Sequence, residues 1–140
     1  LRQGRPESAL ATCEAADARA HALPLPRLAL QSTRCDALVQ LGRLPEAAQV
    51  ATQALQALDD LGGAGWPDVP LRLAACSALL RAGQRDAARE QLAAAESQIE
   101  TRASRISDAK TRLRYLALPE ENLRAQDLAH ELGLSLESTR

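Results

Sequence analysis

The sequence predicts an all-α fold in which helical hairpins stack side by side. Ala and Leu supply most of the apolar residues, aromatic residues make up 1% of the 140-residue chain, and Phe and Met are absent. Ala and Leu are strong helix formers, whereas strands favour the aromatic and β-branched residues that are scarce here. In addition, a glycine turn followed by a helix-forming segment recurs along the chain. We expect about seven helices.

The repeat is defined by three glycines. Gly4, Gly42 and Gly83 are 38 and 41 residues apart, and a period of roughly 20 to 50 residues indicates stacked supersecondary units. At offsets five, nine and twelve after each glycine the residue is small or apolar: Ala9, Cys13 and Ala16; Ala47, Ala51 and Ala54; Ala88, Leu92 and Ala95. These offsets share one helical face, where small side chains let two helix axes approach closely.

A partner helix precedes the second and third glycine, expected roughly over 28–41 and 69–82. Cys35 and Cys76 lie seven residues before these glycines, and Leu38 and Leu79 lie four before them. The unit is therefore helix, tight glycine turn, helix. The stretches "HALPLPR" and "DDLGGAGWPDVP", rich in Pro and Gly, are expected to be the loops between units.

Two further helices are expected after the last unit, where they would cover its exposed core. The sequence supplies their starts and stops: Ser107 or Asp108 as a cap, Pro119, Glu120 and Glu121 as a first turn, and Gly133 as a terminator. Leu123, Leu128 and Leu132 are expected mainly on one face of the second helix.

These assignments divide the chain as one helical repeat domain, 1–140. Its parts are the second helix of a partial unit (4–22), two full units (27–62 and 68–104), a capping helix pair (106–133) and a tail (134–140). Because the chain opens without Met and partway through a motif, we expect it to be a piece of a longer protein.

The unit resembles the tetratricopeptide repeat (TPR). The shared features are a small residue in the middle of the first helix, a glycine turn, then Ala, a larger residue and Ala on the second helix, from Gly4 to about Arg102. The resemblance implies a right-handed α-solenoid whose first helices line a concave face. The chain departs from the family in its units, which exceed ~34 residues, and in Ala, Cys or Leu at most bulky aromatic positions.

The segment from Asp108 through "LPEENL" is similar to the closing segment of repeat arrays in large bacterial signalling ATPases and transcriptional activators. An extra Glu between Pro119 and Asn122 is a departure. This resemblance implies a regulatory repeat domain placed C-terminal to a nucleotide-binding switch in the parent protein. The use of Arg in preference to Lys, with Lys110 the only lysine, also suggests a GC-rich bacterial genome.

Repeat position predicts which side chains face the concave, partner-binding surface. They are Ser32, Asp36, Val39, Gln40, Leu73, Ser77, Leu80 and Arg81. The mixture of apolar and polar residues suits an extended peptide or a partner helix with apolar anchors. Chaperone-binding TPR proteins use clustered Lys and Asn to hold a C-terminal carboxylate, and the predicted face has no such cluster.

The cysteines do not suggest redox or metal chemistry. Cys13, Cys35 and Cys76 are odd in number and lack a CxxC spacing, so a disulfide framework is not expected and a reduced, cytoplasmic setting fits. Two of them occupy small-residue positions of a helix pair, where cysteine acts as a compact hydrophobe. His21 and His130 lack a partner at ligand spacing and are expected to be solvated or at helix ends.

No catalytic arrangement is suggested. The glycines of "LGGAGWP" lack the lysine and the strand–turn–helix context of a phosphate-binding loop, so we interpret this stretch as a link. We expect neither an enzyme nor a cofactor or metal. Trp66 could pack across the inter-unit joint or serve as an exposed binding anchor, and packing is favoured.

Two features could indicate nucleic-acid binding. One is a basic run, interrupted by Glu100 and Asp108, that comprises Arg102, Arg105, Lys110, Arg112 and Arg114. The other is "DLAHELGLSLESTR", which resembles the opening of a helix-turn-helix, although Thr139 falls where an apolar residue is expected. With a net charge of −1, we interpret the basic run as a solvated face.

The preferred functional hypothesis is a non-catalytic protein-interaction or intramolecular regulatory domain of a bacterial signalling or transcription-regulatory protein. Its partner would be a protein, a peptide or another domain of the parent chain, and the open N-terminal end of the array could self-associate. No apolar run reaches the ~18 to 20 residues of a membrane span. The alternatives are a module that senses a small ligand and a nucleic-acid-binding fragment.

Overall fold

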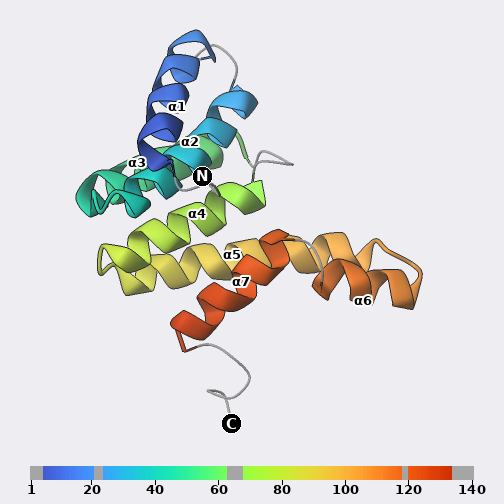
Figure 1. Ribbon diagram of the computed structural model, residues 1–140. Helices are drawn as coiled ribbons and strands as arrows, with labels where there is room; N and C mark the ends of the chain where they lie inside the picture. The colour runs from blue at the N-terminus through green and yellow to red at the C-terminus, as the bar shows by residue number, and fades with distance from the viewer. Residues whose placement is uncertain (1–4, 21–23, 63–67, 118–119, 134–140) are drawn as a thin grey trace.

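The computed structural model describes residues 5–20, 24–62, 68–117 and 120–133. These residues form seven α-helices and no β-strand (Figure 1), so the predicted all-α class is confirmed: α1 (Pro6–Ala20), α2 (Pro24–Gln40), α3 (Leu44–Asp60), α4 (Asp68–Arg81), α5 (Arg85–Ser104), α6 (Ala109–Ala117) and α7 (Glu120–Glu131). Within these ranges, none of the helices is both long and apolar enough to cross a membrane.

Helix α4 is at the centre of the packing. Each of the first five helices contacts the next one in the chain, and α2 also contacts α4 directly. In Figure 1, α4 (green) lies between α2 and α5, and α7 (red) passes across α5; α7 contacts both α4 and α5. Ten of its fourteen residues are buried, as expected for a helix that is enclosed on several sides.

The first hairpin, α2–α3, bends at Gly42. Its φ of +75° lies in the left-handed region that favours glycine. The N–H of Gly42 donates to the carbonyl oxygen of Val39 over 3.0 Å, and the N–H of Arg43 donates to that of Leu38 over 2.9 Å. This pair of hydrogen bonds is the Schellman motif, which satisfies carbonyls that the helix end would otherwise leave unpaired.

The second hairpin, α4–α5, repeats this turn at Gly83, where φ is +85°. The N–H of Gly83 donates to the carbonyl oxygen of Leu80 over 3.1 Å, and the N–H of Gln84 donates to that of Leu79 over 2.8 Å. Every donor and acceptor is displaced by 41 residues from its counterpart at Gly42. The predicted glycine turns are thus confirmed at both positions, whereas Gly4 lies outside the described residues.

Each hairpin has a buried cysteine on its first helix and a buried alanine on its second, at equivalent positions. Cys35 and Ala47 in the first hairpin, and Cys76 and Ala88 in the second, are all fully buried. Cys35 Sγ lies 4.0 Å from the carbonyl oxygen of Ala47. The other predicted small-residue positions of α3 and α5 are buried as well, namely Ala51, Ala54, Leu92 and Ala95. On α1, Cys13 is buried, and Ala9 and Ala16 are partly exposed.

The predicted start of α2 is wrong. The "HALPLPR" loop was expected to reach Arg27, but the helix begins at Pro24 and includes Pro26. Residues in the first turn of a helix have no intrahelical acceptor for their N–H groups, so a proline there sacrifices no hydrogen bond. Residues 21–23 of this loop, and the link residues 63–67 with Trp66, lie outside the described residues.

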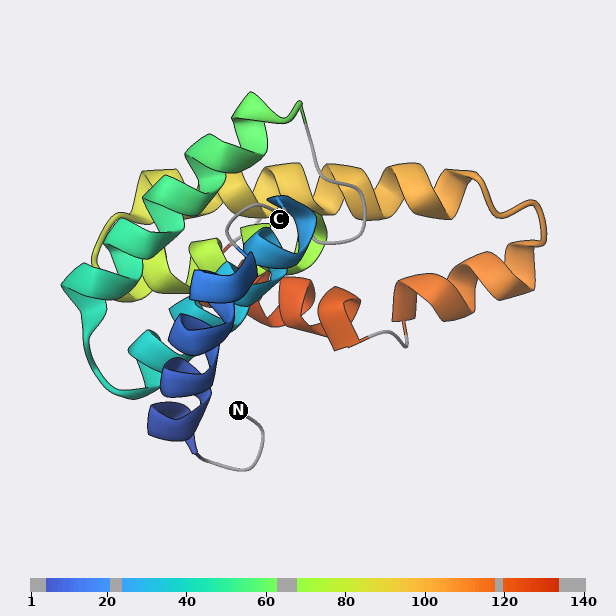
Figure 2. The ribbon, with the colours of Figure 1, turned by 90° about the horizontal axis from the view of Figure 1, so that it is seen from above.

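Helices α6 and α7 run back along α5 (Figure 2), and contacts join α6 to α5 and α7 to both α4 and α5. Asp108 is the cap of α6, because its carboxylate accepts the N–H of Thr111 over 2.8 Å. Gly133, with φ +72°, follows α7 as predicted. Pro119 and the tail 134–140, with the resemblance to a helix-turn-helix that continues into it, lie outside the described residues.

The expectation that Leu123 shares a face with Leu128 and Leu132 is wrong. Leu128 and Leu132 are buried, but Leu123 is 46% exposed. Five residues along a helix correspond to a rotation of about 140° from Leu128, which turns Leu123 toward solvent. The buried face of α7 is made instead by Asn122, Ala125, Leu128 and Ala129, with Leu132 just after the helix.

We predict that Gly83→Ala lowers the free energy of unfolding by about 1–2 kcal/mol, because an L-residue is strained in the left-handed region. No atom lies within 4 Å of the position that the new Cβ would take, so backbone strain alone acts. Gly42→Ala should cost about the same, and Gly83→Asn should cost less because Asn tolerates this region. Urea unfolding measures each; an Ala variant as stable as the parent would contradict the assignment of the turn.

Candidate functional site

The predicted concave residues lie on two helices that contact each other. Four are on α2 and four on α4, and we call these eight residues the α2–α4 face: Ser32, Asp36, Val39, Gln40, Leu73, Ser77, Leu80 and Arg81. The structure places α7 against part of this face. The prediction that the face binds a partner stays a prediction.

Helix α7 covers the apolar part of the α2–α4 face that α4 contributes. Leu73 is fully buried and Ser77 is 9% exposed. Leu73 belongs to the same buried cluster as Ala125 and Leu128 of α7, and Leu80 packs at the edge of that cluster. Leu73 and Ser77, expected at an open surface, are therefore both buried, and Leu73 packs in one cluster with residues of α7.

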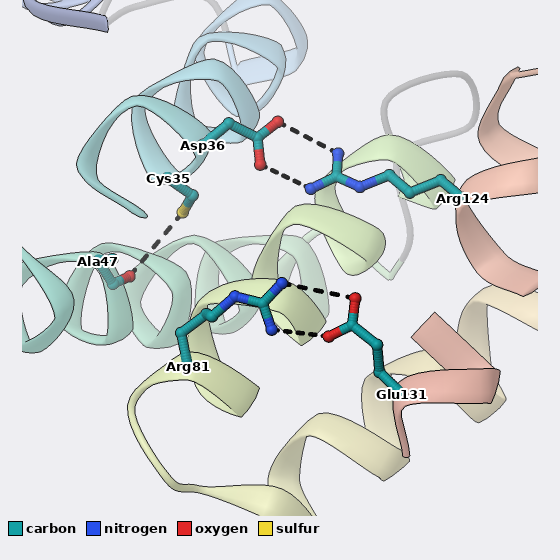
Figure 3. A network of polar contacts seen from close by, with 6 residues as sticks. All are labelled: Cys35, Asp36, Ala47, Arg81, Arg124 and Glu131. Carbon is teal, nitrogen blue, oxygen red and sulfur yellow. Dashed lines mark hydrogen bonds and ion pairs between the residues drawn. The ribbon is translucent and has the colours of Figure 1, made fainter. Parts of the chain in front are cut away.

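At one end of α7, Arg124 pairs with Asp36 of α2. The guanidinium donates two hydrogen bonds to the two carboxylate oxygens, over 2.7 and 3.1 Å (Figure 3). The side chains are 34% and 23% exposed, so water screens this pair only in part. The paired fork geometry fixes direction as well as distance. Arg124 thereby links α7 to α2.

At the other end of α7, Glu131 pairs with Arg81 in the last turn of α4. The two oxygen–nitrogen distances are 2.7 and 3.5 Å (Figure 3). The hydrogen bond from Arg81 holds the pKa of the Glu131 carboxyl below its ordinary value of 4.5. Both side chains are about two-fifths exposed, so the pair contributes little to stability by itself.

A third arginine holds the end of α7 without pairing to a carboxylate. Arg85, the first residue of α5, donates from Nη2 to the carbonyl oxygen of Leu132 over 2.9 Å. Carbonyls at a helix end have no intrahelical donor, and a cation there also interacts favourably with the helix dipole. Arg85 therefore satisfies a carbonyl at the C-terminal end of α7.

The other residues of the α2–α4 face do not meet α7 in a hydrogen bond that the structure records. Ser32 Oγ approaches the carbonyl oxygen of Leu28, in its own helix, at 3.5 Å. Val39 is half-buried against the core of the first hairpin, and Gln40 is exposed. The face thus meets α7 through Asp36, Leu73, Leu80 and Arg81.

Sequence reasoning missed Arg124, Glu131 and Arg85 as members of this site. The available signal was the spacing on α7, where Arg124 and Glu131 are seven residues apart and flank Leu128. A cleft of about 440 Å³ lies beside Arg124 and is lined by Pro70, Leu73, Glu120, Glu121 and Arg124 itself. A second, shallow cleft of about 740 Å³ between α3 and the turn from α4 to α5 includes Arg81 and Pro45 in its lining.

The cysteines are packing residues, as predicted. All three are free and buried. Burial raises the pKa of the Cys35 thiol to about 12 and that of Cys76 to about 11, so both stay protonated at neutral pH. Within the described part of the chain, no three His, Cys, Asp or Glu residues are grouped so as to hold a metal ion. His130 is exposed in the last turn of α7, and His21 is outside the described residues.

The basic run from the last turn of α5 into α6 does not form one continuous solvated surface. Lys110 and Arg114 are exposed, as is Arg105. Arg112 instead donates two hydrogen bonds to the carbonyl oxygen of Ile106, and Arg102 approaches Glu121 at 3.4 Å. Two of the five cations are thus engaged with the chain itself.

Comparison with known proteins gives no match to a family model, a curated protein or a solved structure.

We predict that Arg81→Gln destabilises the chain at pH 7 by roughly 0.2–0.5 kcal/mol and has a smaller effect at about pH 2.5. The folded-state pKa of Glu131 is lowered, so the stabilisation is present above pH 4.5 and is lost as the pH falls through that lower pKa. Urea midpoints at the two pH values measure the difference, with the exposed Arg89→Gln of α5 as control. An equal loss at both pH values would contradict an ionic role for Arg81.

Proposed function

We propose that the chain is a non-catalytic TPR-like repeat domain that binds a protein or peptide partner along the α2–α4 face. In this proposal α2–α3 and α4–α5 are successive units of a right-handed α-solenoid, and α6–α7 is the capping pair. The partner is a separate protein or another domain of the parent chain, which we take to be a bacterial regulatory protein.

The equivalence of the two hairpins supports the repeat interpretation. They share the same Schellman turn and the same pair of buried cysteine and alanine positions, both displaced by 41 residues. Two units built alike that pack through α2 and α4 repeat one another along an axis, and their first helices then line a common face.

The observation that carries the functional proposal is the helix already seated on this face. Both α2 and α4 contribute a charged residue to it, Asp36 from one and Arg81 from the other, with buried Leu73 in the same region. Apolar anchors flanked by charges of opposite sign are the means by which a groove takes an amphipathic helix. This arrangement suits the recognition of a polypeptide.

The thiols support a cytoplasmic compartment. Three free, buried cysteines, odd in number, fit a reducing environment better than an oxidising one. We therefore place the domain in the cytoplasm. The open side of α1 is where further copies of the array would associate.

A peptide-display selection against the intact chain tests this proposal. We expect selected peptides to lose at least tenfold in affinity toward the Asp36→Arg/Arg81→Glu variant. Binding should be unchanged in a matched Arg89→Glu/Glu90→Arg variant, which reverses two exposed charges on α5.

Circular dichroism would confirm that both variants remain helical. The proposal fails if the selection yields no binders, or if the binders treat the two variants alike.

A further inference from the structure

Helix α7 has the pattern of a ligand as well as that of a cap. After Arg124, alanines follow one and five residues later, leucines four and eight residues later, and a glutamate seven residues later. These residues are Ala125, Ala129, Leu128, Leu132 and Glu131. The small residues and leucines are buried, and the two charged residues pair with α2 and α4. At about 100° per residue, Arg124 and Glu131 lie along one border of the apolar stripe.

We propose that α7 is a built-in occupant of the partner site, and that the external partner is an amphipathic helix with the same pattern. That partner carries a cation, leucines four and eight residues later, and a carboxylate seven residues later. The inference rests on the proposed function, and it adds the chemical identity of the partner and competition with α7.

Charge complementarity fixes the direction in which such a helix binds. Asp36 requires a cation and Arg81 requires an anion, and seven residues of helix separate these groups by about 10.5 Å. A helix that ran the other way would place like charges together, which is costly at an interface. Arg85 adds a donor for the carbonyls at the helix end, as it now does for Leu132.

The structure also contains features that favour release of α7. Both ion pairs are partly exposed, so they orient the helix more than they hold it. At the junction of α6 and α7, the Tyr115 hydroxyl and Asn122 Oδ1 are buried with no hydrogen-bond partner in the described part of the chain. Release would return these groups to water and recover their solvation.

A site of entry lies at the start of α7. The cleft of about 440 Å³ there is lined by Pro70 and Leu73 of α4 and by Glu120, Glu121 and Arg124 of α7. Leu73 of the α2–α4 face lines this cleft but has no exposed surface while α7 is in place. An incoming helix can make its first contacts in this cleft before α7 leaves.

Competition with α7 should lower the apparent affinity of the face for an external helix. A resident segment on a short tether has an effective concentration in the millimolar range, so it reduces the apparent affinity of any external helix. Loosening α7 without altering the face should therefore strengthen binding of the external helix.

Fluorescence anisotropy with a labelled synthetic peptide of residues 120–133 measures this directly. We expect the peptide to bind the intact Arg124→Glu/Glu131→Arg chain at least tenfold more tightly than the parent chain. In this variant the α2–α4 face is unchanged. Only α7 carries reversed charges, so Asp36 and Arg81 repel it. The matched control, Lys110→Glu/Asp127→Arg, reverses two exposed charges and should bind the peptide as the parent does.

Hydrogen exchange of the α7 amides accompanies the titration and should be faster in the Arg124→Glu/Glu131→Arg chain than in the parent. A peptide carrying R124E and E131R should bind that chain at least tenfold more weakly than the unaltered peptide. Unchanged exchange, or no gain in peptide binding, overturns the inference. If peptides from the display selection still require Asp36 and Arg81 in that case, the proposed interaction function stands while the helix-mimic inference fails.

Discussion

Two helices pack closely only where the side chains between them are small, and each hairpin here meets this condition with one cysteine and one alanine. Cys35 lies against the backbone of Ala47, and Cys76 and Ala88 occupy the equivalent buried positions. Larger side chains there would push the helices apart and open voids, because protein interiors are packed at nearly crystalline density. The spacing within both hairpins therefore depends on small side chains at these buried positions.

The position of α4 follows from this close packing. Its neighbours α2, α3 and α5 enclose it, and its remaining side receives α7. Apolar burial between these helices supplies the stability. The partly exposed ion pairs Asp36–Arg124 and Arg81–Glu131 set the orientation of α7 on α2 and α4. The packing that buries the middle of α4 leaves Asp36 and Arg81 at the edge of the buried region. There they pair with residues of opposite charge on α7.

The local features of the fold could be predicted from the sequence. A glycine turn and the offsets that follow it depend on a few adjacent residues, so both turns and the buried alanines of α3 and α5 were found correctly. The seat of α7 could not be predicted, because Asp36 and Arg124 are 88 residues apart and no local pattern joins them. Leucine spacing alone does not predict the exposure of Leu123, because five residues of helix turn it by about 140° from Leu128.

The buried cysteine and alanine positions can be tested by enlarging their smaller member. Ala47→Leu and Ala88→Leu each add three carbons to a site with no exposed surface, so each should lower the free energy of unfolding by about 1–3 kcal/mol. Ala93→Leu, at an exposed position of α5, should change it by less than about 0.5 kcal/mol. Urea unfolding of the three variants is the most direct measurement. Equal losses at Ala47 and Ala88, with none at Ala93, are the predicted result; a leucine accepted without loss at either buried position would contradict it.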